Sequence, residues 1–520
     1  MDDVSSPRQD PARRQTTDDR RRSQPSDENK DRNENTSYDF KSHLCGQKLD
    51  PTSERIVRLT YLYGGVHGAI DQLLPACFKA LERDMGFSPQ SLGALSSATR
   101  ISHVLTCPIW GFIIDCCGRR RIFSSSALGW GAATSALLYI TQKWQVLPLM
   151  CVLGIFMAAM GPLSQKVIAQ EVPENDRGRS FGILHFFQSF GRVLSLTITT
   201  SASGLAMWGI EGWRHAMVGF GMISILTGIL LGCRITDCPH QRKRQKEKGH
   251  WFPLSETAYV FRNGSVWVML LMGILNGIPR SAIHFSTMYF QYCSIPDWWA
   301  SFIVSSSWIA AMVVAPVIGC TGDFIHSRYP YHGRQCLAQI CIVARCILMT
   351  IMLTCVPREA TSLGTFVILA VLMGFLAGWP GVGVNRPILT EIVYPEHRAT
   401  TFALVSCLEG VGAAALGAPI VGYLCENVFG YVKPPHGGLL AAAPAESVRV
   451  GNARAISLAM LCMTVGPWLL TIVAYGILHL TYKSDSRHGS ALAATGDAES
   501  ASSPVVGGPQ RSETLPLVTK

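Results

Sequence analysis

The sequence predicts an all-α polytopic membrane protein in which twelve transmembrane helices form two pseudo-symmetric six-helix bundles. Of its 520 residues, 48% are hydrophobic and only 15% are charged, whereas soluble proteins carry roughly 25% charged residues. A helix needs about 20 mostly apolar residues to cross a bilayer. Runs that meet this requirement cover 56–78, 91–114, 122–141, 145–167, 180–204, 214–235, 266–290, 299–320, 335–356, 362–386, 400–425 and 454–481.

The composition of the chain changes at four places, which divides it into five parts. Residues 1–54 are polar and residues 483–520 are rich in Ser, Gly, Ala and Pro, so we expect two disordered tails. Between them, 55–235 and 263–482 are the expected N-terminal and C-terminal bundles. The linker 236–262 contains the basic run QRKRQKEK, for which a solvated loop is the default expectation.

The basic residues are distributed as membrane topology would place them. The chain carries a formal net charge of +10, and its Lys and Arg residues are concentrated in loops on one side of the predicted helices. The positive-inside rule then places both termini in the cytosol, in a plasma membrane or an endomembrane. No signal peptide is visible, so the first helix is the expected insertion signal. Topology accounts for the charge without a nucleic-acid partner.

Motifs for catalysis, ATP hydrolysis and metal binding are missing from the sequence. The pattern GxxxxGK[ST] does not occur, and neither do hydrolase or kinase signatures. The 17 cysteines lie scattered through apolar segments rather than at zinc or disulfide spacing. We therefore expect no enzyme activity, no cofactor and no metal.

Three features of the first half recur in the same order about 210–220 residues later. Asp115 has a counterpart in Asp323, and His67 to Asp71 aligns with Asn276 to Arg280. The segment QEVPENDRGRSFGIL is matched by TEIVYPEHRATTFAL. An ordered repeat of this kind predicts two homologous halves. Transporters built from parallel repeats bind their solute between the halves, near the bilayer midplane.

These residues resemble those of the major facilitator superfamily of transporters, over approximately 55–482. The loop Gly111-x-x-x-Asp115-x-x-Gly118-Arg119-Arg120 is similar to the family's loop between helices two and three, although Cys116 stands where a basic residue is usual. Glu171–Gly178 and Gly212–Arg214 resemble two further family elements. The second-half loop departs from the pattern, because Gly333–Arg334 is displaced after Asp323. The sequence of this loop resembles the Spinster-like or organic-solute branches of the family.

The resemblance implies an ion-paired latch between helix ends that favours an outward-facing state and breaks when the cavity opens inward. Simple anchoring of the topology is the alternative. The latch candidates are Gly111, Asp115, Gly118, Arg119, Glu171 and Arg177, with Asp323 and Arg334 in the second half.

Charges at membrane depth cost roughly 2.5–3.5 kcal/mol each, so each one needs a role. Asp71 in the first helix and Arg280 in the seventh occupy equivalent repeat positions, and we expect both to line a central cavity. Asp71 would carry a proton or cation, while Arg280 would bind an anionic group or stabilise the ionised form of Asp71. A structural ion pair between them is the alternative reading.

Further polar residues are expected at the same depth. His67 lies one helical turn before Asp71, where it would act as a proton relay or as a packing residue. Interhelical bonding explains Arg100, His103 and His185 at least as well as a functional role. The other candidates for substrate or proton binding are Asn276, His284, Arg192 and Glu409.

These observations predict a secondary active transporter that moves a small organic solute by alternating access, with protons as the candidate coupling ion. A receptor or scaffold that kept the fold but lost transport is the alternative, and a channel is a third reading. The expected partners are the solute and the lipid bilayer, and the expected oligomeric state is a monomer. The substrate and the direction of flux stay open.

Overall fold

A computed structural model describes residues 50–207, 209–235, 264–393, 398–435, 437 and 444–502. Most of the predicted N-terminal tail, residues 503–520 of the C-terminal tail and the whole linker 236–262 therefore lie outside the described residues. The last helix continues to Ser502, so residues 483–502, predicted as the start of a disordered tail, are helical. The side chains of Asp115 and Asp323 are also outside the described part, although their backbones are helical.

The N-terminal half consists of helices and one short hairpin. Strands β1 (Ala206–Met207) and β2 (Ile210–Glu211) pair antiparallel, with Ala206 opposite Glu211. The helices are α2 (Pro51–Ala76), α3 (Phe78–Met85), α4 (Pro89–Cys116), α5 (Arg119–Ala136), η1 (Leu137–Tyr139), α6 (Lys143–Met157), α7 (Met160–Glu171), α8 (Glu174–Ala202) and α9 (Gly212–Arg234).

The C-terminal half is helical throughout its described residues and contains four π-helical segments. Its α-helices are α12 (Gly264–Ala282), α13 (Ser286–Tyr292), α14 (Asp297–Arg328), α15 (Gly333–Thr350), α16 (Leu363–Ala377), α17 (Arg386–Ile392), α18 (Arg398–Gly412), α19 (Ala418–Tyr423) and α20 (Glu446–Ser502). The π segments are η3 (Ile351–Cys355), η5 (Trp379–Asn385), η6 (Ala413–Gly417) and η7 (Leu424–Val428), and the 3₁₀ turns are η2 (Ile283–Phe285) and η4 (Ala360–Ser362).

Local sequence explains where several helices begin. Asp50 caps α2 by accepting a hydrogen bond from the Thr52 amide, and Pro51 occupies the first turn, where its missing N–H costs nothing. The hydroxyl of Ser88 caps α4 and Ser91 returns a bond to the Ser88 amide, so both orphan donors are satisfied.

Joined end to end, the described helices make twelve rods that overlap the twelve predicted runs, although α20 extends 21 residues beyond its run of 454–481. Eight of these rods are long and apolar enough to cross a membrane by themselves, within the described residues. The remaining four contain α2, α4, α5 and α8. The structure thus has an all-helical membrane protein fold, and the full set of twelve crossings stays a prediction.

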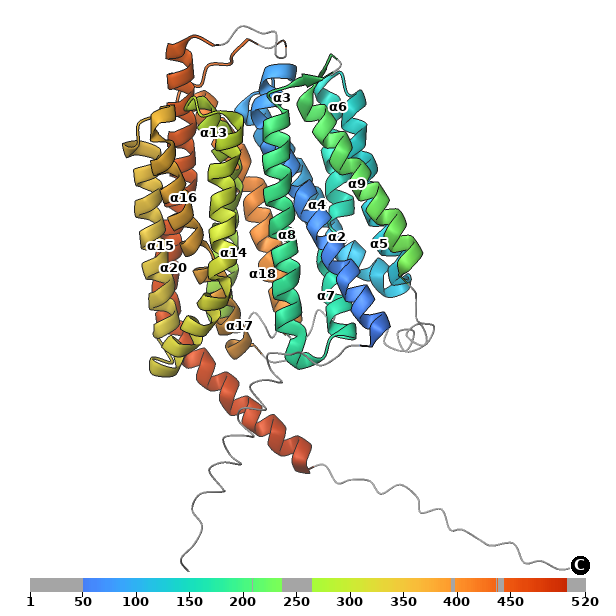
Figure 1. The fold of residues 1–520 in the computed structure, drawn as a ribbon. Coiled ribbons are helices and arrows are strands. Elements are labelled where there is room, and N and C mark those ends of the chain that lie inside the picture. Colours follow the sequence, from blue (N-terminus) through green and yellow to red (C-terminus); the bar gives the residue numbers. More distant parts are fainter. Residues whose placement is uncertain are drawn as a thin grey trace, which may run out of the picture.

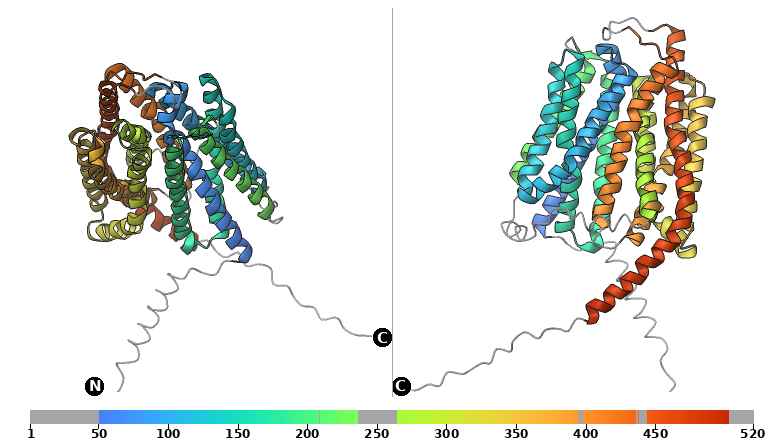
Figure 2. Two further views of the ribbon diagram at one scale, coloured as in Figure 1. Left: turned by 45° about the horizontal axis from the view of Figure 1, so that its top comes forward. Right: turned by 180° about the vertical axis from the view of Figure 1, so that it is seen from behind.

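The rods stand roughly parallel, with the N-terminal half (blue to green) beside the C-terminal half (yellow to red) (Figures 1 and 2). Helix α2 begins and α20 leaves the bundle at the same end, which we call the tail end; α3 and α13 lie at the opposite end, the far end (Figure 1). Between the halves, α4 packs on α18, η6 and α19, and α8 packs on α14.

The closest approach between the halves is made by glycines. A Cβ atom on Gly93 of α4 would lie 2.4 Å from the carbonyl oxygen of Ala418, and one on Gly422 of α19 would lie 2.5 Å from the Cα of Gln90. Small residues let helix backbones come this near. The contact between α4 and α19 therefore depends on both glycines.

Candidate functional site

The N-terminal half places one acid between two arginines at mid-depth. Asp71 of α2 accepts hydrogen bonds from Arg100 of α4, at 2.9 Å, and from Arg192 of α8, at 3.5 Å. The Arg192 side chain is only 9% exposed and that of Asp71 13%. Buried charges persist only when they are paired and hydrogen-bonded. This arrangement satisfies that condition for Asp71, and its two arginines leave one positive charge in excess.

The C-terminal half has its own pair at the equivalent depth. Arg280 of α12 donates to Glu409 of α18 over 2.9 Å, and the two side chains are 49% and 33% exposed. Arg280 also interacts electrostatically with Asp71 and Arg192. Its exposed surface therefore belongs to the space between the halves and not to the lipid-facing side.

Asp71 and Arg280 do not form the structural ion pair of the alternative reading among the described residues. Each residue binds an opposite charge from its own half, because neighbouring helices of one bundle bring the nearer groups. Arg100, which the sequence explains equally well as an interhelical bond, makes the shortest contact with Asp71. The two residues still share one polar region, as their through-space interaction indicates.

Four histidines surround this cluster. His67 is buried one turn before Asp71 and packs edge-on against Trp130, with 5.4 Å between ring centroids. Neither of its ring nitrogens has a hydrogen-bond partner among the described residues. His103, His185 and His284 all interact electrostatically with the arginines of the cluster.

Two more residues complete the surroundings of the cluster. Asn276 is half-buried on α12, one turn before Arg280. Trp308 of α14 lies across from Arg192, whose guanidinium carbon is 5.3 Å from the indole centroid. This cation–π contact joins the two halves. Trp308 was not a predicted site residue, since a Trp within an apolar run is indistinguishable from packing.

Each half carries an arginine–glutamate ion pair between two rods at the tail end. In the first half Arg119, at the start of α5, binds Glu171 at the end of α7, and the Ser53 hydroxyl donates to the same carboxylate at 2.5 Å. In the second half Arg334, at the start of α15, binds Glu391 near the end of α17. The two pairs occupy corresponding places in the repeat, and we call them the N latch and the C latch.

The other predicted latch residues have different surroundings. Arg177 donates to the backbone carbonyls of Val172 and Ala169, at 3.2 and 2.9 Å. Gly118 has φ −66° and ψ 140°, an extended conformation that any residue adopts, so its backbone does not require glycine. A Cβ on Gly111 would meet nothing within 4 Å. The side chains of Asp115 and Asp323 lie outside the described part of the chain, so their predicted roles in the latch stay predictions.

The far end holds a second buried charge, which joins the halves. Glu82 of α3 is 1% exposed and receives hydrogen bonds from Lys79 at 3.0 Å, from Tyr292 of α13 at 2.6 Å and from Tyr431. The Lys79 ammonium also lies 3.1 Å from the centroid of the Tyr292 ring. Burial, reinforced by Glu82, raises the pKa of Tyr431 well above its ordinary value, so this hydroxyl stays protonated and donates. We call these four residues the far-end bridge.

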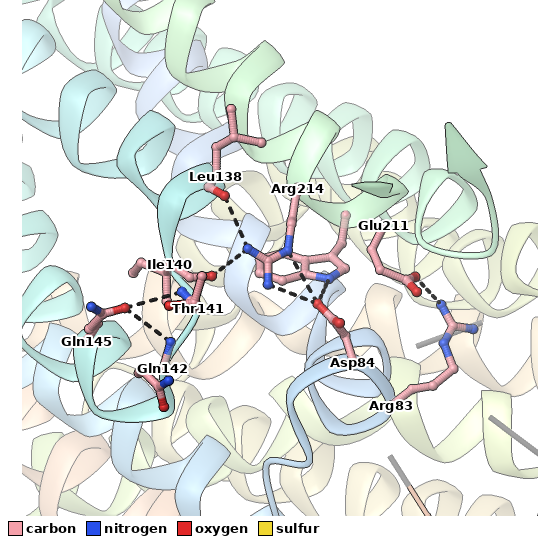
Figure 3. A network of polar contacts seen from close by, with 10 residues as sticks. Arg83, Asp84, Leu138, Ile140, Thr141, Gln142, Gln145, Glu211 and Arg214 are labelled. Atoms are coloured by element: carbon pink, nitrogen blue, oxygen red, sulfur yellow. Dashed lines mark hydrogen bonds and ion pairs between the residues drawn. The ribbon is translucent and has the colours of Figure 1, made fainter. Parts of the chain in front are cut away.

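A separate network fastens helices within the N-terminal half at the same end (Figure 3). Asp84 accepts from Arg214 at 3.2 Å and from the Trp213 indole at 3.1 Å. Arg214 also donates to the carbonyls of Leu138 and Ile140, at 3.2 and 2.6 Å. The Gly212–Arg214 element therefore ties α3, the end of the third rod and α9 into one unit.

Comparison with known families gives one clear match. Residues 61–333, more than half of the chain, match the model of the Major Facilitator Superfamily. The 4-hydroxybenzoate transporter PcaK of Pseudomonas aeruginosa is 24% identical over 199 residues, which are 38% of this chain and 43% of PcaK. The multidrug resistance protein MdtG of Escherichia coli is 26% identical over 239 residues, 45% of this chain and 56% of MdtG. The matched part thus spans about half the length of these curated relatives.

Solved structures share the fold over most of the chain. A bacterial homologue of the human lysosomal transporter Spinster, in an inward-facing and unoccupied conformation, superposes with a TM-score of 0.71. It is 16% identical, and the match covers 85% of this chain and 99% of that one. A D-xylose–proton symporter superposes with a TM-score of 0.60 at 14% identity, over 79% and 97% of the two chains. Identities this low bear on the fold alone.

Proposed function

The chain belongs to the Major Facilitator Superfamily, and from this premise we propose that it is a secondary transporter of a small organic anion. The solute would bind between the halves, at the cluster around Asp71 and Arg280, and cross by alternating access. The tail end carries most of the basic residues, so the positive-inside rule places it, with both termini, in the cytosol.

The balance of charge in the central cluster carries this proposal. Three arginines, Arg100, Arg192 and Arg280, face two carboxylates, Asp71 and Glu409. An uncompensated cation at membrane depth is costly, and a bound carboxylate or similar anion would offset it. Arg280 is the arginine best placed for this role, because its side chain is half exposed between the halves. PcaK, a relative whose name specifies an aromatic acid, supports the same class of solute.

The hydrogen bonds between the halves support an inward-facing state. Those that join described residues of the two halves lie in the far half of the bundle. They include the far-end bridge and the bonds Ser97 to the Ala414 carbonyl at 2.6 Å, the Gln90 backbone N–H to Glu426 at 2.7 Å, the Gly437 N–H to the Arg83 carbonyl at 3.0 Å and Thr197 with Ser305 at 3.4 Å. With the tail end in the cytosol, the path would be closed on the outside. His67, whose nitrogens are unbonded beside Asp71, would let protons serve as the coupling ion.

Uptake into proteoliposomes tests the proposed function. We expect saturable uptake of small aromatic and aliphatic carboxylates, stimulated by an inward proton gradient, and no uptake of their neutral amides. Arg280→Gln should reduce uptake at least tenfold because it removes the anion's partner, and Arg280→Lys should retain an intermediate rate because the charge is kept. Arg345→Gln is the matched control and should leave uptake unchanged, because the Arg345 guanidinium stacks on the Trp468 ring at 4.2 Å, between α15 and α20.

A second variant addresses coupling. Asp71→Asn should abolish uptake driven by the proton gradient while leaving expression and membrane insertion intact. Full uptake by this variant would reject a coupling role for Asp71. Flux that does not saturate would favour a channel, and no flux of any tested carboxylate would favour the alternative of a receptor or scaffold that retains the fold.

A further inference from the structure

A groove at the tail end of the N-terminal half has the polarity of a phospholipid. It lies between α5 and α9, which pack along their lengths, and has a volume of about 420 Å³. Its lining residues are Arg120, Arg121, Ser124, Ser125, Leu128, Ile229, Gly232 and Cys233. None of these described lining residues is acidic.

The polar and apolar groups follow one another along the groove in a fixed order. Arg120 and Arg121 are exposed at the start of α5, and the hydroxyl residues Ser124 and Ser125 come one turn further in. Leu128 lies deeper, facing α9. This sequence of cation, hydroxyl and apolar surface matches the phosphate, the ester-linked glycerol and the acyl chain of a phospholipid.

Both helices extend this pattern beyond the groove. On α9 the side chains of Ile229, Leu226 and Met222 are 51%, 63% and 55% exposed, which gives an acyl chain an apolar track toward the bilayer centre. Exposed Arg234 ends α9 at the same level as the two arginines of α5. Helix α5 begins there without a side-chain cap, so the positive end of its dipole also favours an anion.

We propose that this groove binds the headgroup of an anionic phospholipid, with the phosphate held by Arg120 and Arg121 and one acyl chain lying against α9. The occupant is membrane lipid rather than a soluble anion, because the groove continues into an apolar, exposed helix face. The site is separate from the central cluster, so it does not depend on the identity of the transported solute.

The chain offers a matched control groove. At the start of α2, a groove of about 350 Å³ is lined by Pro51, Glu54, Arg55, Arg58, Leu59 and Leu62. It also has two arginines and two leucines, but Glu54 forms an ion pair with Arg58. Glu54 itself lines this groove and repels an anionic headgroup, so the groove should not select for lipid charge.

Native mass spectrometry of the intact chain, equilibrated with mixed phosphatidylglycerol and phosphatidylcholine, tests the proposal. Each arginine near an anionic surface contributes about a tenfold or slightly smaller factor to lipid affinity. Arg120→Gln with Arg121→Gln should therefore lower phosphatidylglycerol retention on the order of tenfold or more, with phosphatidylcholine retention unchanged. Arg55→Gln with Arg58→Gln should leave both unchanged.

A third variant separates binding in the groove from general attraction to charge. Cys233→Trp fills the groove from an exposed position and keeps all the arginines, so it should lower phosphatidylglycerol retention as well. Unchanged retention in the Arg120/Arg121 variant, or an equal loss in the Arg55/Arg58 variant, would overturn the proposal. Normal retention by a correctly folded Cys233→Trp variant would overturn it too.

Discussion

The two ends of the bundle are held together in different ways. At the far end, Glu82 of the first half is buried among Tyr292 and Tyr431 of the second, so the bonds cross from one half to the other. At the tail end, the N latch and the C latch each join two rods of a single half. The far end thus fixes how the halves meet, whereas the tail end fixes the shape of each half.

This difference separates two functions that the sequence analysis gives to a single latch: to hold the helix ends of one half together, and to favour one conformation of the transporter over the other. An ion pair inside one half keeps its geometry when the halves rock as rigid bodies, whereas a bridge between halves must break. Under the proposed alternating access, the far-end bridge, rather than the N latch, would contribute directly to the energy difference between the two conformations.

Breaking the far-end bridge should have the largest effect. Glu82→Gln removes the carboxylate charge that accepts hydrogen bonds from Tyr292 and Tyr431 of the other half, and a hydrogen bond to a charged group contributes about 1.5–3 kcal/mol. That cost falls on the closed far end, so the population open at this end should rise on the order of 100-fold or more. Distance measurements between spin labels on α3 and α13 would detect the opening.

The control for this change lies on the same face of the molecule. Glu211 pairs with Arg83 at 3.4 Å within the N-terminal half, so Glu211→Gln should leave the distance between the halves unchanged. Equal opening in both variants would show that the bridge has no special role.

Breaking a latch should have an intermediate effect of a different kind. Glu171→Gln and Glu391→Gln each weaken charge-assisted hydrogen bonds, which contribute about 1.5–3 kcal/mol. We expect a lower unfolding temperature for both variants, with the spin-label distance at the far end unaltered. A latch variant that opens the far end would contradict the assignment of the latches to single halves.

Removing one hydroxyl of the bridge should have the smallest effect. Tyr431→Phe deletes a single donor to the Glu82 carboxylate, which keeps its bonds from Lys79 and Tyr292, so the expected cost is about 1.5 kcal/mol, the low end for a bond to a charged group. The far end should open measurably but less than in Glu82→Gln. An effect as large as that of Glu82→Gln would mean that the contact between the two tyrosines, and not the carboxylate, holds the two halves together at the far end.

The sequence predicts the rods and the repeat because both depend on local pattern. Apolar runs of membrane length give the positions of the helices, and the repeat of a Glu before a Pro and an Arg correctly pairs Glu171 with the region of Glu391. The structure shows these two acids in equivalent latches. Spacing alone therefore identifies residues that have the same place in each half.

Contacts between distant segments are not encoded in such spacing. Tyr431 and Glu82 are 349 positions apart, and Glu82 lies in a short helix that reads as a loop between membrane runs. Arg100 has no counterpart in the repeat, which is why its bond to Asp71 was not predicted. The π segments of the second half also escape prediction, because their apolar sequences suit an α-helix equally well.

Reversible cross-linking across the far end tests the central claim most directly. Gln90 and Glu426 lie on opposite halves, and the backbone N–H of Gln90 donates to the Glu426 carboxylate over 2.7 Å. In a background without native cysteines, Gln90→Cys and Glu426→Cys joined by a short bifunctional methanethiosulfonate should lose uptake, and a reductant should restore it. The same treatment of Arg83→Cys with Glu211→Cys, both in one half, should leave uptake intact. Full uptake by the cross-linked Gln90/Glu426 pair would contradict opening of the far end as a step of transport.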